Sequence, residues 1–316
     1  MAISLCGKTG GNTGGVKCAV SPGKAQALAI WSGKLTTAEM LTQATIKTTL
    51  LADSKLSKNA ADKLFVLPVV INRENQKEAN TEFTFSSGMK VVTREGLPGY
   101  RFGFMTSQQQ MKNLRKFNDQ GVSLLVQDDS LNIWGTVNGD GEFIGRQAKL
   151  FFEGLTHVDD ASPKGVAYVT VSFIDAVESF DDQYFVSVDF GLNNTLSALI
   201  DVQLYQKATA ASNVLKISAK IDTGSAAEQL DIYSDFSTAL ADKTLWTVRN
   251  LNTGGAITID GVAGNANGFW EVTLDSDEFA LITNGHVLEV NLVAPQTLDA
   301  ANAKGIEATS TTYTKV

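Results

Sequence analysis

The stretch Leu131–Glu153, LNIWGTVNGDGEFIGRQAKLFFE, holds two apolar segments separated by Asn138-Gly139-Asp140-Gly141. Asparagine, aspartate and glycine tolerate positive φ, which the tight turns of β-hairpins require. Apolar and polar side chains alternate on both sides of the turn, as in strands that bury one face. The stretch therefore predicts a β-hairpin inside a β-rich domain.

The same period of about two residues continues on either side of this hairpin. Pro68 indicates an edge position for the first of the strands, because proline cannot donate to a sheet ladder. We expect half-buried antiparallel strands at residues 63–71, 80–93, 99–105, 122–127, 131–137, 142–153, 167–176 and 184–190.

Two segments have helical spacing instead. Thr36-x-x-Glu39 is a capping box, and the apolar positions after it predict a helix over residues 37–52. Ser107 can cap a second helix, QQQMKNLRKFN, with one apolar stripe and one basic stripe. The first domain is thus expected to be a β-sandwich or barrel with two helices.

At 316 residues the chain exceeds the usual size of a single core, so two domains are expected. Residues 1–24 are rich in glycine and predict an extended arm that becomes ordered on a neighbouring subunit. Residues 25–190 would form the first domain, and Gly191–Asn194 a linker. Residues 195–316 contain about seven short strands, typical of an immunoglobulin-like β-sandwich, without the cysteine and tryptophan signature of true immunoglobulin domains.

Charge is distributed unevenly along the chain. Residues 1–120 contain 16 Lys and Arg against 8 Asp and Glu, whereas residues 121–190 contain 3 against 12 and residues 191–316 contain 7 against 14. A basic first third and an acidic remainder favour contact between unlike surfaces, within one subunit or between copies. The low pI of 4.9 argues against a protein that wraps nucleic acid.

Few residues are candidates for catalysis or for metal binding. The two histidines, His157 and His286, lie in expected turns, and Cys6 and Cys18 have no histidine nearby for a zinc site. The cysteines are expected to be free thiols, with a disulfide formed after release as the alternative. Residues 2–9 match a relaxed phosphate-binding loop, but the glycines that follow cannot form its helix. We therefore predict no enzyme, and no catalytic, cofactor-binding or metal-binding residues.

Aromatic residues on alternate strand positions admit two interpretations. They match a platform on which single-stranded nucleic acid stacks, but the core of a sandwich requires the same spacing. Because few basic residues lie between them, we expect them to be core. They are Phe83, Phe85, Tyr100, Phe102, Phe104, Phe151 and Phe152.

No stretch approaches the roughly 20 apolar residues of a membrane-spanning helix, so no membrane association is expected. The start, MAISLCGKTGG, has its lysine after the short apolar run and no small-residue cleavage site. It does not predict a secretory signal. We expect a protein made in the cytoplasm, unless it leaves the cell as part of a particle.

Residues 1–190 resemble the tail and tube proteins of tailed bacteriophages, in particular those infecting Bacteroidetes. The segments that carry the resemblance are the arm with Cys6 and Lys17-Cys18, the double strand from Arg94-Glu95-Gly96 to Gly103-Phe104, the helix with Leu114-Arg115-Lys116-Phe117, and Ile133-Trp134-Gly135-Thr136 leading to Phe143-Ile144-Gly145. Residues 195–316 look like the immunoglobulin-like decoration domains of such proteins.

The resemblance implies a virion protein assembled in the host cytoplasm, most simply a tail tube subunit. Its hexameric rings would stack around a lumen through which DNA passes without specific binding, in contact with other virion proteins. A capsid decoration protein, a receptor-contacting module of a virion or a surface adhesin remain alternatives.

We expect copies to recognise one another through a basic helix face and several acidic turns, all exposed in the isolated subunit. Contact between a basic face and an acidic face is heterologous and generates rings or filaments. The expected interface residues are Lys112, Arg115 and Lys116 on the helix and Asp128, Asp129, Asp159, Asp160, Asp181 and Asp182 in the turns.

Overall fold

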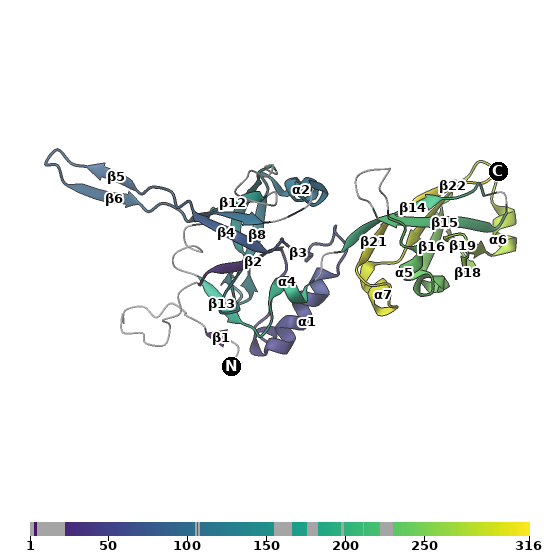
Figure 1. Ribbon diagram of the computed structural model, residues 1–316, viewed down its shortest axis with the longest axis horizontal. Helices are drawn as coiled ribbons and strands as arrows, with labels where there is room; N and C mark the ends of the chain where they lie inside the picture. Colours follow the sequence, from purple (N-terminus) through teal and green to yellow (C-terminus); the bar gives the residue numbers. More distant parts are fainter. Residues whose placement is uncertain are drawn as a thin grey trace. The chain divides into compact units, whose positions relative to one another are not determined.

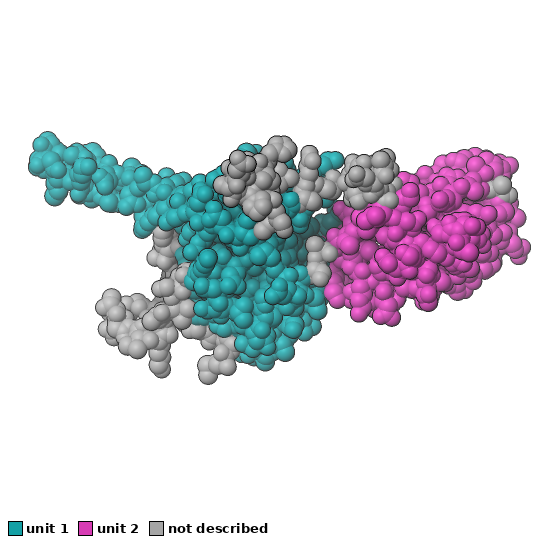
Figure 2. Space-filling view, in the orientation of Figure 1, with its two compact units in different colours: residues 1–54, 58–197 teal, residues 55–57, 198–316 magenta. Residues whose placement is uncertain are grey.

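The computed structural model describes residues 3–4, 23–104, 106, 108–154, 166–175, 183–196, 199–210, 212–221 and 230–316. Most of the glycine-rich segment therefore lies outside the described residues, with both cysteines and all of the phosphate-loop match at residues 2–9 except Ile3 and Ser4. The chain divides into two compact units, residues 1–54 with 58–197 and residues 55–57 with 198–316 (Figure 2). Strands predominate in both units, which confirms the mainly β class (Figure 1).

The first unit is built on a branched sheet of 11 strands, in which β8 pairs with β2, β9 and β11. A separate two-stranded sheet of β5 and β6 extends from it. The described elements are β1 (Ile3–Ser4), β2 (Ala25–Trp31), the 3-10 helix η2 (Glu39–Leu41), α1 (Gln43–Ser54), β3 (Leu64–Val66), β4 (Val70–Asn75), β5 (Thr81–Thr84), β6 (Lys90–Arg94), β7 (Gly99–Phe104), α2 (Gln108–Leu114), the 3-10 helix η3 (Arg115–Phe117), β8 (Gly121–Asp128), β9 (Asn132–Val137), β10 (Phe143–Ile144), β11 (Arg146–Phe152), β12 (Ala167–Phe173), β13 (Tyr184–Ser187) and α4 (Leu192–Thr195).

Strand β2, AQALAIW, lies between two apolar clusters and is buried on both faces. Ala29 and Trp31 face a cluster that α1 covers with Ile46 and Leu50. Leu28, on the other face, belongs to a cluster that α2 covers and to which β7, β11 and β12 contribute. A strand buried on both sides has to be apolar at nearly every position, as this one is.

The hairpin predicted from the Asn138–Gly141 turn is confirmed. Phe143 pairs with Val137 and Ile144 with Thr136, antiparallel. The Asn138 side-chain oxygen accepts the N–H groups of Asp140 and Glu142, each at 3.0 Å. Gly141 has φ of +79°, a conformation that costs other L residues free energy. The turn chemistry read from the sequence is therefore the chemistry that forms.

The helix predicted at residues 37–52 is interrupted. The capping box forms, because Thr36 N–H donates to the Glu39 carboxylate at 2.8 Å and Glu39 N–H donates to Thr36 Oγ1 at 3.4 Å. Thr42 then adopts an extended conformation, and its hydroxyl accepts Thr45 N–H at 3.1 Å at the start of a new helix. The segment is therefore one 3-10 turn followed by α1.

Residues 191–194, predicted as a linker, belong instead to the first core. Leu192 is fully buried, and its N–H donates to the Gln127 side chain at 2.7 Å. The Gln127 amide in turn donates to the Phe190 carbonyl at 2.8 Å. Residues 192–195 form the short helix α4, and the buried Gln127 side chain accepts the N–H group of its first residue.

The second unit is a sandwich of two sheets with the strand orders β18-β19-β15-β14-β21 and β17-β16-β20-β22. Strands β14 and β21 are parallel, and the other described pairs in the unit are antiparallel. The elements are β14 (Ile200–Gln206), β15 (Val214–Ile221), α5 (Tyr233–Phe236), the 3-10 helices η4 (Ala239–Ala241) and η5 (Lys243–Leu245), β16 (Trp246–Asn250), β17 (Ala256–Ile257), β18 (Ile259–Asn265), β19 (Phe269–Leu274), α6 (Ser276–Leu281), β20 (Val287–Leu292), α7 (Pro295–Ala300), β21 (Ile306–Thr309) and β22 (Thr311–Thr314).

A single apolar core fills this sandwich, and both sheets contribute to it. Trp270 of one sheet and Trp246 of the other lie with ring centroids 6.1 Å apart. The Lys315 ammonium is buried close to the core, where it donates to the Phe279 carbonyl at 2.7 Å and the Ile282 carbonyl at 2.6 Å. It thereby adds a charged donor to two carbonyls at the C-terminal end of α6, of which that of Phe279 also accepts Ile282 N–H at 3.2 Å.

Candidate assembly surfaces

The predicted basic helix face is present on α2 and η3. Met111 and Leu114 are buried in the core, and Lys112, Arg115 and Lys116 are exposed. The spacing of three and four residues places the three cations on one side of the helix. The predicted cap, Ser107, lies outside the described residues.

Of the predicted acidic turns, only Asp129 is described as exposed. The prediction is wrong for Asp128, which is buried with 1% of its surface exposed. Its Oδ2 accepts Trp134 Nε1–H at 2.7 Å and Gly23 N–H at 3.2 Å, and its Oδ1 accepts Asn132 N–H at 2.9 Å. The pairs at residues 159–160 and 181–182 lie outside the described residues.

The hydrogen bonds of Asp128 keep it charged. Burial by itself raises the pKa of this carboxyl, but the donors of Trp134, Asn132 and Gly23 outweigh it, so the pKa lies below its ordinary value. The carboxylate also accepts Ser130 N–H at 2.9 Å. Asp128 is therefore a structural group that ties the start of β2 to the β8–β9 turn.

A second prediction that fails concerns Phe83 and Phe85, which were expected in the core. Every residue from Ile71 to Glu95 is exposed, and β5 and β6 form a ribbon that extends beyond the main sheet (Figures 1 and 2). We call residues 74–96 the ribbon. Phe102, Phe104 and Phe152 are buried as predicted, whereas Phe151 is exposed.

The two faces of the ribbon differ in character. Phe83 pairs with Val91, and Phe85 N–H donates to the Met89 carbonyl at 2.8 Å, so these four side chains share one face. Their exposed fractions are 54%, 42%, 44% and 57% for Phe83, Val91, Phe85 and Met89. The two phenyl rings meet edge to face with centroids 4.9 Å apart.

The cations of the ribbon form cross-strand ion pairs. Lys77 bonds Glu95 at 2.5 Å, Arg94 bonds Glu78 at 3.1 Å and Lys90 lies 3.4 Å from Glu82. Each cation of the ribbon therefore has its acid on the opposite strand. These ion pairs favour one register between the two strands of the ribbon. The apolar face of the ribbon is not covered by any described residue.

The base of the ribbon is fixed to the main sheet. The Arg101 guanidinium on β7 donates to both Glu153 oxygens, at 2.8 and 2.6 Å, and to Glu74 at 3.3 Å. This fork lowers the pKa of the Glu153 carboxyl. Gly96 allows the strands to cross closely, because a Cβ there would lie 1.9 Å from the Glu78 carbonyl oxygen. The ribbon is thus a built extension of β4 and β7.

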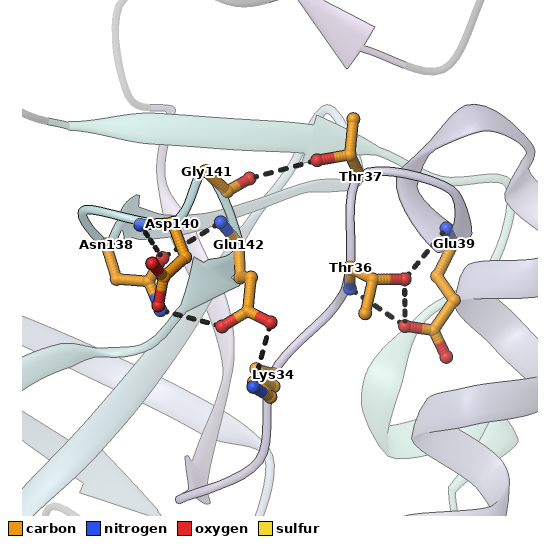
Figure 3. A network of polar contacts seen from close by, with 8 residues as sticks. All are labelled: Lys34, Thr36, Thr37, Glu39, Asn138, Asp140, Gly141 and Glu142. Carbon is orange, nitrogen blue, oxygen red and sulfur yellow. Dashed lines mark hydrogen bonds and ion pairs between the residues drawn. The ribbon is translucent and has the colours of Figure 1, made fainter.

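Another polar network joins the Asn138 turn to the segment before η2 (Figure 3). Lys34 bonds Glu142 at 2.8 Å, and Thr37 Oγ1 donates to the Gly141 carbonyl at 3.4 Å. The Glu142 bond raises the pKa of Lys34, and the Lys34 bond lowers the pKa of Glu142. Thr36 and Thr49 satisfy Glu39 on the other side. Because these polar groups are hydrogen-bonded or ion-paired with one another, we assign the network a structural role that joins the Asn138 turn to the segment before η2.

The described residues contain no cluster of histidine, cysteine and carboxylate side chains suited to a metal ion. His286 lies in a turn, as predicted, with Nδ1 3.1 Å from the Asn250 amide nitrogen, and His157 is outside the described residues. No helix in the described part of the chain is long and apolar enough to cross a membrane.

Comparison with protein-family models and with curated proteins finds no match for the chain.

Proposed function

We propose that the chain is a self-assembling structural subunit of a virion, and specifically a tail tube subunit whose rings stack around a conduit for DNA. The observation that supports this best is the apolar face of the ribbon, formed by Phe83, Phe85, Met89 and Val91. The resemblance of residues 1–190 to phage tube proteins supplies the kind of assembly.

A ribbon of this kind has a physical need for a partner. An isolated two-stranded hairpin is at best marginally stable in water, and a third layer or strand is normally needed to cover its apolar face. A phenylalanine side chain contributes roughly 150–250 Å² when buried, so four large side chains at about half exposure form a patch of a few hundred Å². Apolar patches of this size are often functional surfaces.

The charge of the chain suits a conduit for DNA. A net charge of −8 repels a polyanion, so DNA would pass such a protein without being held. The exposed cations of α2 and η3 would then serve contacts between subunits. Each exposed pair contributes only about 0–1 kcal/mol, so charges would orient the subunits while apolar surface supplies affinity.

The first test removes the apolar face without touching the core. We expect the full chain to form rings or tubes in negative-stain micrographs, and the double variant Phe83→Ser, Phe85→Ser to remain monomeric by light scattering. Val92→Ser, on the opposite face of the ribbon and 51% exposed, is the matched control and should assemble. Monomeric behaviour of the full chain at all concentrations would refute the proposal.

The second test addresses the basic helix face. Assembly should slow as salt rises from roughly 0.05 to 0.5 M, because the Debye length shortens to a few Å. Reversal of Lys112, Arg115 and Lys116 to Glu should block assembly, and Asp129→Lys in the partner should restore part of it. Kinetics that ignore salt, together with a triple reversal that assembles normally, would show that these charges lie outside the interface.

A further inference from the structure

A hydrogen-bond network at one end of the second unit contains His286, the one histidine among the described residues. The ring is half-buried immediately before β20, and its Nδ1 lies 3.1 Å from Nδ2 of Asn250, the last residue of β16. Asn250 is only 5% exposed, so water cannot easily replace the partners of its amide. The ring therefore has a defined partner on the neighbouring strand.

The orientation of the Asn250 amide determines which ring nitrogen of His286 carries the proton. Asn250 Oδ1 accepts Asn252 N–H at 3.0 Å, so Nδ2 is the amide atom directed at the ring. An amide nitrogen only donates, and His286 Nδ1 must therefore be the unprotonated, accepting nitrogen of a neutral ring. The ring proton is then on Nε2.

The same network holds the loop of residues 251–255 against β20. Asn252 Oδ1 accepts Val287 N–H at 2.7 Å, and Leu251 N–H donates to the Val287 carbonyl at 2.9 Å. Asn252 is thus bonded on one side to the Asn250 amide and on the other to the residue that follows His286. Every residue of the loop is exposed, so its attachment to β20 depends on few contacts.

A proton on both ring nitrogens is incompatible with this arrangement. Both nitrogens of an imidazolium are donors, so Nδ1–H of His286 would face the N–H groups of the Asn250 amide. Reversal of the amide would bring its oxygen to the ring, but it would turn Nδ2 toward Asn252 N–H. In either orientation a donor lies opposite a donor, and a buried polar group without a partner is costly.

The charged groups around the ring also oppose a second positive charge. The β20–β22 pairing continues to Lys315, whose N–H donates to the His286 carbonyl at 2.9 Å, so the two residues are cross-strand neighbours. The Lys315 ammonium is held on the carbonyls at the end of α6, whose acids lie in its first turn. On β16, Arg249 pairs with Glu289 and lies on the opposite face from Asn250. Among the described residues, no carboxylate forms an ion pair with His286.

We infer that His286 is an acid-sensitive switch of the second unit. The neutral ring accepts the Asn250 amide and keeps residues 251–255 docked on β20, whereas the protonated ring breaks this contact and releases the loop. Because the neutral ring makes the contact, its contribution is present above the range in which histidine takes up a proton, roughly pH 8 to 5, and is lost as the pH falls through that range. The inference concerns a single subunit and does not depend on the proposed self-assembly.

Nitrogen NMR of the full chain tests the tautomer directly. Long-range ¹H–¹⁵N correlation spectra distinguish the two ring nitrogens, and the variant His286→Asn identifies the signals of position 286. At about pH 8 we expect the tautomer with the proton on Nε2. A proton on Nδ1 would overturn the inference, because the contact with the Asn250 amide could not then form.

Hydrogen exchange tests the release of the loop. The backbone amides of Asn252 and Val287 should lose about tenfold in protection, relative to the unfolded chain, between about pH 7.5 and pH 5. Amides of β15 and β19 in the same unit provide the internal reference and should change less. Equal changes in the loop and in these strands would show that acid loosens the whole unit, and the inference would be wrong.

Three variants assign the acid response to the contact. His286→Asn places an amide oxygen near the position of Nδ1 and cannot titrate, so protection of the loop should no longer depend on pH. Asn250→Asp replaces the donor by an acceptor, so protection should be retained in acid. His157→Asn, which removes the other histidine, is the matched control and should keep the wild-type response. An acid response that persists in either of the first two variants, or that disappears in the control, would overturn the inference.

Discussion

Replacing the buried Asp128 carboxylate by the isosteric amide, Asp128→Asn, is expected to destabilise the first unit by about 2–6 kcal/mol. The amide retains one oxygen, which can still serve the Ser130 and Asn132 N–H groups. Its nitrogen would face the donors of Trp134 and Gly23 and leave them unsatisfied. Each buried donor without an acceptor costs about 1–3 kcal/mol, which gives the expected range.

The unfolding free energy is to be measured by urea titration with pulsed hydrogen exchange, so that peptides of the first unit are read separately from those of the second. Asp129→Asn is the control, because the Asp129 side chain is exposed and accepts only Lys24 N–H, at 3.1 Å, among the contacts described. It should change stability by no more than about 0.5 kcal/mol. Peptides of the second unit should unfold at the same urea concentration in both variants.

The pH dependence of unfolding provides a further test of the role of Asp128. Because the pKa of Asp128 is lowered in the folded protein, its contribution is complete above the ordinary value of about 3.9 and is lost as pH falls through the folded value. The stability gap between the wild type and Asp128→Asn should therefore narrow as the solution is acidified. An Asn variant as stable as the wild type at pH 7, or a gap that does not change with acid, would refute the assignment.

Two further pairs of variants test other parts of the fold, each read by urea unfolding. Lys315→Met should destabilise the second unit by about 1–3 kcal/mol, because two carbonyls at the end of α6 lose a charged donor, whereas the exposed control Lys304→Met should stay within about 0.5 kcal/mol. Gly141→Ala should cost about 1–2 kcal/mol through its positive φ alone, since a Cβ there meets only Thr37 Oγ1 at 3.8 Å; Gly139→Ala, which has open space and no positive φ, should be nearly neutral. Equal effects within either pair would contradict these assignments.

Local chemistry was the most predictable part of this protein. The strands predicted at residues 122–127 and 131–137 form within one residue of those bounds, as β8 and β9, because a two-residue period and flanking turns determine such segments locally. The Asn138 turn and the Thr36 capping box also form. The sequence did not predict the helix break at Thr42. A threonine hydroxyl can cap a new helix or lie along a continuous one, and the tertiary structure decides between the two.

Exposure was less predictable than strand position. The alternation in residues 80–93 correctly indicates one apolar face. The same pattern occurs whether or not a second layer of the protein covers that face. A signal was present in the polar run Asn72–Asn80, in which Ala79 is the one apolar residue, because a strand that leaves a core needs no apolar positions. Asp128 was predicted in an exposed turn and is buried instead. Trp134 and Asn132 of β9 cover its carboxylate, and this contact depends on how β9 folds back along β8.

The double burial of β2 has a consequence for the order of folding. Gly23, just before β2, donates its N–H to Asp128, 105 residues further along the chain, whereas the ribbon closes between Thr84 and Lys90. Contacts between residues far apart in sequence form slowly, and a hairpin closes in microseconds. During synthesis the ribbon can therefore form before the ribosome has released the strand that completes the core. Under the proposed self-assembly, we expect a nascent chain to present the ribbon before its core is complete, so that the timing of translation would influence assembly together with the final structure.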